Sequence, residues 1–367
     1  MKKRKRIALV YKDLSLGGVQ KKIVDISNEL ISRKDVEVYL FLTQKKGEFL
    51  KKITSGVNIV DLHGSSKLPF VVFLPLKLWF NFLKYRPHVV YAMMDTYGCA
   101  SVLAGKISGD RKPRIIISQN VLASRFFEQR PFTKFRRWLV RKLYPEADCI
   151  VSLSEAITSD LNEKFGIPKR KIILMRNWLE SPLSREERNR ENKDIDILYA
   201  GRFAPEKNLS LLLDAFRILV RKRPHATLCL LGYGECEKEI RKKMENLRLE
   251  HNVKMPGFTH NVRRYLRRAK MLTLSSSNEG TPMVMLEAMA TGVPVISTGF
   301  PGVHEVITHK KSGIIVKSAK DMAQWMDQLL WDDQLRKKIT CGAFMIIKKR
   351  YPARNLYKLI EFVCRYA

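Results

Sequence analysis

Short apolar runs alternate with amphipathic segments along most of the chain, and this pattern predicts the secondary structure. Runs of about four to eight apolar residues indicate buried strands, and apolar residues three or four positions apart indicate helices. In the first half we expect strands at residues 6–10, 36–42, 57–61, 89–92, 114–118, 148–153 and 171–175, and helices at 19–32, 74–85, 97–107 and 155–165. Strands that alternate with helices form parallel sheets covered by helices.

The same alternation restarts after a polar segment near the middle of the chain. Residues 181–194 show no hydrophobic period, which is typical of a linker, so we expect one domain at 1–180 and a second at 195–345. In the second domain we expect strands at 195–200, 226–231, 253–255, 270–274, 293–297 and 313–316, and helices at 209–221, 235–247, 282–291 and 320–330. The predicted fold class is α/β, with two Rossmann-like, doubly wound parallel-sheet domains that face each other across a cleft.

The composition is that of an ordinary globular protein, but the charge is unusual. Of 367 residues 45% are apolar, whereas 68 Lys and Arg stand against 36 Asp and Glu, a net charge of +32. Such a charge attracts anions, so nucleic acid, anionic lipid and a phosphorylated substrate are the candidate partners. The longest apolar run, 70–83, is too short for a transmembrane segment. The six cysteines show no Cys-x-x-Cys spacing, which fits a reducing cytosol without a zinc site.

The strongest local signal is the segment SNEGTPMVMLEAMATGVPV at 277–295, which lies between two expected strands. Thr281 is a good N-cap and Pro282 a good first helical residue, so the free amides of 281–284 would bind an anion. Glu279 lies on the turn, and Glu287 lies in the helix. Carboxylates only accept hydrogen bonds, so both suit a ligand rich in hydroxyl groups.

A second signal, GRFAPEKN at 201–208, follows the first expected strand of the second domain. Gly201 allows close approach of a ligand, and Arg202 and Lys207 form a cationic clamp for phosphate groups. The alternative is that both cations are ordinary solvated charges. Their place at a strand end opposite the Glu279 turn favours the clamp.

Two glycine turns could also bring backbone amides close to a ligand. Gly17 and Gly18 open the first expected helix, although a turn with positive φ explains them equally well. Gly232 and Gly234 match only half of the dinucleotide-binding motif, because Glu237 stands where the third glycine belongs. We therefore exclude NAD binding.

Together these motifs resemble the retaining nucleotide-sugar glycosyltransferases of family 4, which have the GT-B fold. The resemblance covers nearly the whole chain and rests on the Glu-x7-Glu spacing, the EGTPMVMLEAMATGVPVIST block, GRFAPEKN and the N-terminal GGVQ. It implies a diphosphate held by Arg202 and Lys207, a ribose held by Glu287 and a donor sugar contacted by Glu279. The expected catalytic residues are Glu279, Arg202 and Lys207, and the expected donor-binding residues are Gly17, Gly18, Gly201, Gly280, Thr281, Pro282, Met283, Val284 and Glu287.

The resemblance implies further properties and shows two departures. No metal or other cofactor is expected, and residues 346–367 should form a helix that packs back on the first domain. Many relatives carry a histidine where this chain has Gln119 and Asn120, so either amide is a candidate donor to the acceptor or the transition state, and a core-facing role is the alternative. Asn177 resembles the first residue of the family's Asn-Pro hinge, but the proline is missing.

A metal site finds no support in the residues themselves. The segment Asp194-Ile195-Asp196 looks like the Asp-x-Asp of metal-dependent transferases, yet it opens a buried strand. The seven histidines show no pairing typical of metal ligands.

The predicted activity is transfer of a sugar, with retained configuration, from a nucleoside-diphosphate donor to a lipid-linked or surface-polysaccharide acceptor such as lipopolysaccharide. UDP is preferred to GDP because it is the commoner donor in the family. The leaving diphosphate would deprotonate the acceptor hydroxyl while the clamp stabilises its charge. One alternative is a nucleic-acid- or sugar-binding protein without transferase activity. Another is a hydrolase that uses Glu279 and Glu287 as paired acids, although hydrolases need no phosphate clamp.

Residues 124–144 combine seven basic and six aromatic side chains. A basic amphipathic helix with aromatic anchors is typical of a segment that lies in a membrane interface, and the alternative is a core helix with solvated charges. The candidate membrane contacts are Arg125, Phe126, Arg130, Lys134, Arg137, Trp138 and Arg141. No nucleic-acid-binding module is recognised. We therefore expect a cytoplasmic protein that associates peripherally with the anionic inner face of the cell membrane.

Overall fold

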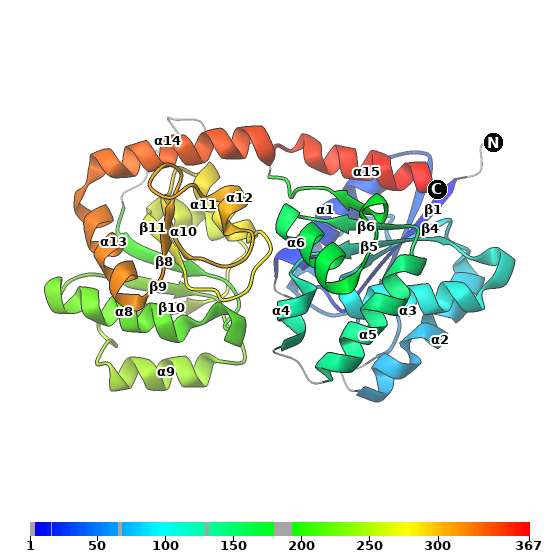
Figure 1. The fold of residues 1–367 in the computed structure, drawn as a ribbon, viewed down its shortest axis with the longest axis horizontal. Coiled ribbons are helices and arrows are strands. Elements are labelled where there is room, and N and C mark those ends of the chain that lie inside the picture. The colour runs from blue at the N-terminus through cyan, green and yellow to red at the C-terminus, as the bar shows by residue number, and fades with distance from the viewer. Residues whose placement is uncertain (1–3, 16, 65–67, 129–131, 180–192) are drawn as a thin grey trace. The chain divides into compact units, whose positions relative to one another are not determined.

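The computed structural model describes residues 4–15, 17–64, 68–128, 132–179 and 193–367. The chain forms two compact units: the first comprises Met1–Arg176 with Arg354–Ala367, and the second comprises Asn177–Ala353 (Figure 1). Most of the expected linker, 181–194, lies outside the described residues. No helix in the described ranges is both long and apolar enough to cross a bilayer.

The first unit contains, in its described part, a seven-stranded parallel sheet with the strand order β3-β2-β1-β4-β5-β6-β7. Its strands are β1 Lys5–Tyr11, β2 Val36–Leu42, β3 Asn58–Asp61, β4 Val89–Met93, β5 Arg114–Gln119, β6 Cys149–Ser152 and β7 Ile172–Leu174. Its α-helices are α1 Gly18–Ile31, α2 Leu68–Tyr85, α3 Met94–Ile107, α4 Ala123–Glu128, α5 Thr133–Leu143, α6 Glu155–Ser159 and α15 Arg354–Tyr366. Helices α2, α3 and α5 cover one face of the sheet, and α1 and α15 cover the other (Figure 1).

The second unit contains, among its described residues, a six-stranded parallel sheet with the order β10-β9-β8-β11-β12-β13. Its strands are β8 Ile195–Ala200, β9 Leu228–Leu231, β10 Val253–Gly257, β11 Ala269–Leu274, β12 Val295–Thr298 and β13 Ile314–Val316. Its helices are α8 Leu209–Lys222, α9 Glu237–Asn246, α10 Val262–Arg268, α11 Met283–Ala290, α12 Val303–Val306, α13 Ala319–Trp331 and α14 Asp333–Arg350.

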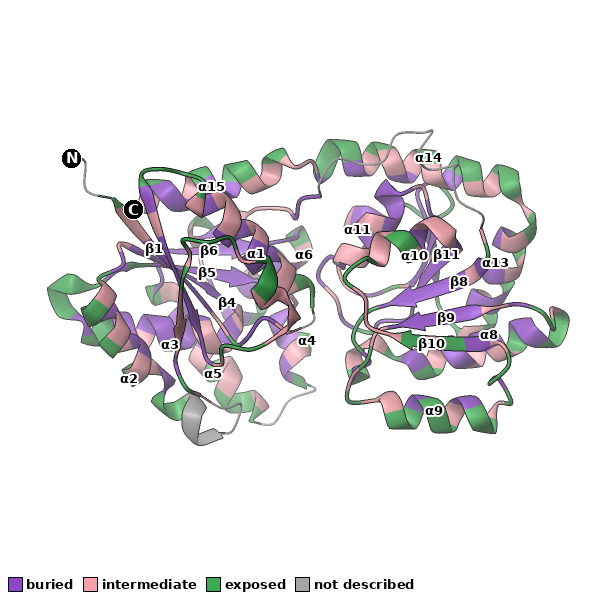
Figure 2. Cartoon of the chain, turned by 180° about the vertical axis from the view of Figure 1, so that it is seen from behind, coloured by how far each residue is buried: buried purple, intermediate pink, exposed green. Residues whose placement is uncertain are grey.

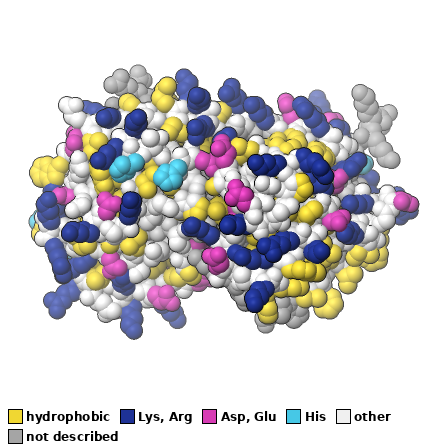
Figure 3. Space-filling view, in the orientation of Figure 1, with side chains coloured by type: hydrophobic (Ala, Val, Ile, Leu, Met, Phe, Trp, Pro, Cys, Tyr) yellow, Lys and Arg dark blue, Asp and Glu magenta, His cyan; other side chains and the backbone are white. Residues whose placement is uncertain are grey.

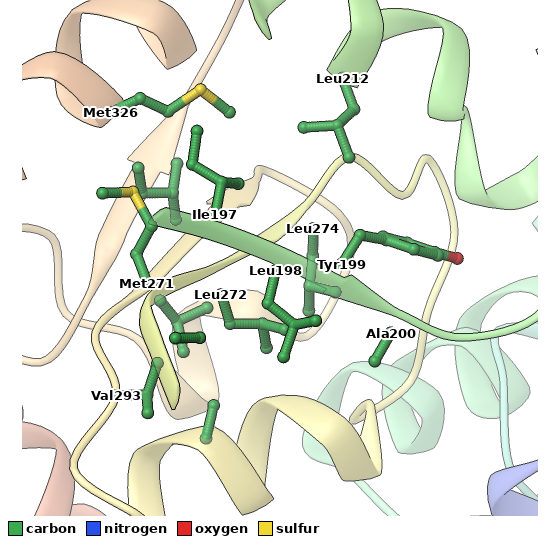
Figure 4. Close-up of a cluster of buried hydrophobic side chains, with 14 of the residues drawn as sticks. Ile197, Leu198, Tyr199, Ala200, Leu212, Met271, Leu272, Leu274, Val293 and Met326 are labelled. Atoms are coloured by element: carbon green, nitrogen blue, oxygen red, sulfur yellow. The ribbon is translucent and has the colours of Figure 1, made fainter. Parts of the chain in front are cut away.

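The cores explain why the central strands read as continuous apolar runs. A parallel sheet is covered by helices on both faces, so its inner strands are buried on both sides (Figure 2). Every residue of β4 is buried. In the second unit the side chains of β8, β11, α8 and α13 interlock around Ile197, Met271, Leu212 and Met326 (Figure 4). The predicted α/β class with two parallel sheets is confirmed.

Three predicted helix boundaries differ from those in the structure. Helix α2 begins at Leu68 rather than at the predicted residue 74, and it includes Pro75. The prediction missed its first turns because the apolar residues of the helix lie on more than one face. The basic segment 124–144 forms α4 and α5 rather than one helix. Residues 346–350 belong to α14, and the element that contacts α1 and β4 of the first unit begins at Arg354.

Candidate functional site

Two neighbouring strands of the second unit bring the two strongest sequence motifs together. Strand β8 pairs in parallel with β11, so the loops that follow them leave the same edge of the sheet. The loops are joined by hydrogen bonds from the Ser277 amide to the Glu206 carbonyl (2.9 Å) and from the Ser275 hydroxyl to the Lys207 carbonyl (2.8 Å). The Arg202–Lys207 segment and the Glu279 turn therefore form one continuous surface.

Lys207 and Glu279 form an ion pair at the junction of these loops. The Lys207 ammonium donates to Glu279 Oε1, which also accepts a hydrogen bond from Ser276 Oγ at 3.2 Å. Both side chains are largely buried, so each has a fixed position. A lysine ammonium carries three donors, and one that contacts Glu279 can still donate to a phosphate oxygen.

Arg202 occupies the more open side of the same loop. Its guanidinium donates to Glu206 Oε1 at 2.6 Å, and 43% of its side chain is exposed. An exposed guanidinium retains donors for a second, bidentate partner such as a diphosphate. The expected clamp thus consists of one accessible cation and one that is nearly buried.

The helix after the Glu279 turn starts one residue later than predicted. Pro282 has extended ψ (126°) and is itself the N-cap of α11, so the prediction that Thr281 caps the helix is wrong. The amides of Met283 and Val284 lead the helix, where the first N–H groups have no intrahelical partners. Glu287 lies half-buried one turn further along, and Gly280 is buried in the turn.

Two polar side chains on this turn are buried without a hydrogen-bond partner among the described residues. They are Thr281, through Oγ1, and Asn278, through Oδ1. An unpaired buried polar atom costs about 1–3 kcal/mol, so such atoms mark a position where a ligand can supply the missing partner. The Thr281 carbonyl, by contrast, accepts a hydrogen bond from Asn177 Nδ2 at 3.1 Å. Asn177, which sequence analysis compared only to a hinge, therefore fixes the turn.

Glycines at the ends of β8 and β9 let the surrounding loops pack closely. A Cβ at Gly232 (φ 138°) would lie 2.0 Å from the Gly201 carbonyl oxygen, and one at Gly234 would lie 2.3 Å from the Phe203 carbonyl oxygen. Close backbone packing therefore explains why glycine stands at both positions. Gly201 is exposed beside Arg202.

The first unit also gathers polar groups at the carboxyl ends of its strands. Gln119 is fully buried: its Nε2 donates to the Val121 carbonyl (2.9 Å), and its Oε1 accepts from the Tyr144 hydroxyl (2.7 Å). Burial raises the pKa of Tyr144 well above its usual value, so this phenol remains a donor. Asn120 Nδ2 is buried and has no hydrogen-bond partner in the described part of the chain.

The remaining predicted residues occupy separate places. Gly17 is the N-cap of α1 at φ 154°, and Gly18 is its first residue. Asp194 pairs with Arg268, and Asp196 pairs with Lys270 at 2.8 Å. Among the described residues no group of three or more His, Cys, Asp or Glu side chains could hold a metal ion.

The candidate membrane contacts divide into two groups. Arg125, Lys134, Trp138 and Arg141 are exposed. Phe126 is half-buried against the core, and Arg137 is half-buried with its guanidinium near the Ser124 carbonyl and Glu128. Arg130 lies outside the described residues.

Comparison with known proteins covers nearly the whole chain. Residues 16–180 match the family described as "Glycosyltransferase Family 4", and residues 180–343 match "Glycosyl transferases group 1". The chain is 26% identical over 344 residues to the N-acetylgalactosamine-N,N'-diacetylbacillosaminyl-diphospho-undecaprenol 4-alpha-N-acetylgalactosaminyltransferase of Campylobacter jejuni, covering 90% of this chain and 92% of that protein. It is 30% identical over 195 residues to WcaL of Escherichia coli, a putative colanic acid biosynthesis glycosyltransferase, covering 50% of this chain and 48% of WcaL.

Solved structures of similar fold cover the chain almost completely. Anabaena Alr3699/HepE in complex with UDP and glucose has a TM-score of 0.81 at 18% identity, covering 99% of this chain and all of that one. The sucrose-phosphate synthase of Thermosynechococcus elongatus has a TM-score of 0.82 at 16% identity, covering 99% and 98%. At this level of identity the likeness shows the fold.

Proposed function

The chain belongs to the glycosyltransferases of the GT-B fold, and from this premise we propose that it transfers a sugar from a uridine diphosphate donor with retention of configuration. The proposed acceptor is a hydroxyl group on a lipid-linked or polysaccharide glycan. Two relatives support this class: the Campylobacter jejuni enzyme is named for action on an undecaprenol-linked glycan, and WcaL is a putative colanic acid biosynthesis glycosyltransferase. A solved structure of the same fold that contains UDP and glucose supports the donor.

The observation that carries the proposal is the convergence of cations, helix amides and unpaired polar atoms at one edge of the second unit. Arg202 and Lys207 are suited to the two phosphates, and the amides of Met283 and Val284 present the positive end of α11. Thr281 Oγ1, buried on the same turn, has no hydrogen-bond partner in the described part of the chain, and a phosphate or sugar oxygen would supply one.

The carboxylates take the hydroxyl groups of the donor. Glu287 is proposed to hold the ribose and Glu279 the transferred sugar, because carboxylate oxygens accept hydrogen bonds from hydroxyls. Glu279 is held by Lys207 and Ser276, so its position relative to the phosphate clamp is fixed. Gly201, Gly280, Thr281 and Pro282 complete the donor site, and Gly17 and Gly18 are proposed as donor contacts from the first unit.

The proposed reaction is a substitution on the face of the sugar that carries the leaving group. The bond from the anomeric carbon to the diphosphate oxygen breaks, and a bond from the acceptor oxygen to that carbon forms. The acceptor hydroxyl proton passes to the leaving diphosphate. Arg202, Lys207 and the helix amides stabilise the negative charge that develops there, and loss of one such donor typically lowers the rate by about 10²–10³-fold.

From the first unit we assign the hydrogen-bond donor of this reaction to Asn120. Both hydrogen-bonding ends of the Gln119 amide are engaged, with Tyr144 and with the Val121 carbonyl, whereas Asn120 Nδ2 lacks a partner among the described residues. This choice separates the two amides that the sequence left equivalent. Metal independence is part of the proposal, and activity should persist in excess EDTA.

A panel of nucleotide sugars, screened by thermal shift on the full chain, tests the proposed donor. A UDP-sugar at about 100 times its dissociation constant should add roughly 2.7 kcal/mol of stability. Glu287→Ala should abolish the shift, whereas the control Arg221→Ala, an exposed residue on α8, should retain it. A shift with free oligosaccharides but with no nucleotide would instead support the sugar-binding or hydrolytic alternative.

A further inference from the structure

Helix α2 has two apolar faces. One is buried in the core of the first unit, and the other is exposed. Leu74, Leu78 and Phe82 are buried in the core of the first unit. Large apolar side chains with 49–65% exposure stand on the other side, at Val72, Phe73, Leu76 and Phe80. At about 100° per residue these four fall within an arc of roughly 100°, so they form one stripe. A helix that is apolar all round is normally covered, and the exposed stripe has no covering among the described residues.

Helix α5 adds aromatic rings and cations beside this stripe. Phe135 and Trp138 are 56% and 53% exposed, and their rings stack with centroids 6.0 Å apart. The outer face of the same helix also carries the exposed cations Lys134, Arg141 and Lys142. Phe132, just before the helix, is 61% exposed. Aromatic rings flanked by cations match the boundary between acyl chains and anionic headgroups.

Hydrogen bonds link the inner side of α5 to residues at the carboxyl ends of strands in the first unit. Arg136 donates to Asp95 Oδ2 at 3.1 Å, at the start of α3. Burial raises the pKa of Asp95, although Arg136 opposes this. Tyr144, directly after the helix, donates to Gln119 at the end of β5. Arg141, on the outer face, also donates to the Lys164 carbonyl at 3.0 Å. Lys134 and Lys142 are therefore the outer cations to substitute, because they differ from the residues that hold α5 in place.

The two outer faces belong to the same side of the first unit. Helix α3 packs against both α2 and α5, and the three cover one face of the sheet (Figure 1). Figure 3 shows hydrophobic side chains gathered over α2 and α5, with Lys and Arg side chains next to them. We name this the α2–α5 surface, comprising Val72, Phe73, Leu76, Phe80, Phe132, Phe135, Trp138, Lys134, Arg141 and Lys142.

We propose that the α2–α5 surface docks the first unit onto an anionic lipid bilayer. Charge complementarity supports this partner, because exposed cations of α5 accompany the apolar side chains of the surface and the whole chain carries a net charge of +32. A nucleic acid would leave the exposed aliphatic side chains Val72 and Leu76 of α2 unused, since it needs cations along a groove together with aromatic rings. The proposal names the exposed residues of α2 and leaves out Arg125, Phe126 and Arg137, which the sequence prediction includes. It does not depend on the identity of the sugar donor.

Co-sedimentation of the full chain with vesicles tests this docking. Binding should be strong to equimolar phosphatidylcholine and phosphatidylglycerol, weak to phosphatidylcholine alone, and largely lost at about 1 M salt, where the Debye length is about 3 Å. Lys134→Gln and Lys142→Gln should each weaken binding roughly fivefold, and Phe73→Ser with Phe80→Ser should weaken it roughly tenfold or more. The control pair Lys337→Gln and Lys338→Gln, exposed on α14, should leave binding unchanged.

A second measurement locates the contact independently of affinity. Brominated lipids should quench the fluorescence of Trp138, so Trp138→Phe should lose the quenching while its folding remains unchanged. Trp331, which is 72% exposed in the second unit, is the matched control, and Trp331→Phe should retain the quenching. Equal quenching in both variants overturns the proposal.

Two other outcomes would also overturn it. If the α2 substitutions convert a dimer to a monomer in solution and leave vesicle binding unchanged, the surface joins two copies of the chain. If the lysine substitutions weaken binding to DNA and leave vesicle binding unchanged, the surface serves nucleic acid.

Discussion

Thr281 illustrates how a single buried hydroxyl can serve a ligand at the expense of stability. Its Oγ1 is buried and has no partner among the described residues, while its carbonyl is fixed by Asn177. Removal of an unpaired buried polar atom is neutral or stabilising when the shape is conserved. The residue should therefore matter more to donor binding than to the fold.

We expect Thr281→Val to leave the free energy of unfolding unchanged or to raise it by about 1 kcal/mol. The same substitution should weaken UDP-sugar binding about tenfold, because the ligand loses a hydrogen bond in a buried site. Thr281→Ser keeps the hydroxyl and should bind normally. Calorimetric titration and chemical unfolding give both quantities, and a destabilised Thr281→Val protein with normal affinity would show that the hydroxyl is structural.

Lys22 is a second residue whose environment predicts a measurable effect. It is buried in α1, and this burial lowers its pKa from 10.5 to about 7, although Asp25 opposes the shift. The unfolded chain keeps this proton up to the higher value, so the unfolded state binds more protons between pH 7 and 10.5. The free energy of unfolding must therefore rise with pH over this interval.

Lys22→Met should remove that pH dependence. At pH 7 the variant should be more stable than the wild type by about 2–4 kcal/mol, since each unit of pKa shift corresponds to about 1.36 kcal/mol. Above pH 10.5 the difference should nearly vanish, because the lysine is then neutral in both states. Urea unfolding at the two pH values measures this, and an equal difference at both would show that the charge is not the cause.

At the level of elements, the site depends on loops at the ends of β8 and β9 that touch through glycine. Gly232 has φ 138°, and a Cβ there would meet the Gly201 carbonyl oxygen at 2.0 Å. The loop that carries Arg202 would then have to move. Gly257 has φ 80° in the same unit but has nothing within 4 Å of its Cβ position.

Gly257→Ala should lower the free energy of unfolding by about 1–2 kcal/mol, because alanine is strained at this positive φ. Gly232→Ala should lower the free energy of unfolding by more than Gly257→Ala does. It should also weaken UDP binding, because it displaces the loop that carries Arg202 of the proposed phosphate clamp. Thermal unfolding and UDP titration of both variants check this. Equal stability losses with normal UDP binding would mean that the contact between the two loops does not position Arg202.

The elements that sequence predicts well are those with one dominant signal. Strands 36–42 and 195–200 are placed without error because an aspartate precedes each one, and Thr43 or Gly201 directly follows it. The first residue of helix α2 is predicted wrongly, because apolar residues on two faces of the helix obscure its periodicity. Helix α10, VRRYLRR, is missed because its seven residues show the helical spacing only once, at Val262, Tyr265 and Leu266, among four arginines.

The candidate site is predictable in its residues but not in its contacts. GRFAPEKN and the Glu279 turn are visible in the sequence, whereas the ion pair of Lys207 with Glu279 needs β8 and β11 to be neighbours. The choice between Gln119 and Asn120 depends on Tyr144, which is 25 residues away from Gln119. Sequence spacing alone does not encode either contact.

At the scale of the whole molecule, we propose two separate roles for the excess of positive charge. The second unit places Arg202 and Lys207 beside Glu206 and Glu279, so the phosphate site is locally balanced and depends on geometry and helix amides. On the first unit, α5 carries cations on its outer face, Lys134, Arg141 and Lys142, that form no ion pair with an acidic side chain among the described residues. The first arrangement suits a defined diphosphate, and the second suits a diffuse anionic surface.

The central claim is that the second unit recognises a diphosphate. Calorimetric titration of UDP and UMP into the wild type and into Arg202→Ala and Lys207→Ala tests this most directly, because UMP lacks the second phosphate. We predict that Arg202→Ala and Lys207→Ala each lower UDP affinity by about 10²-fold, the loss typical of one charge-assisted contact. UMP affinity should change little. Unchanged UDP affinity in both variants, or equal losses for UDP and UMP, would contradict the claim.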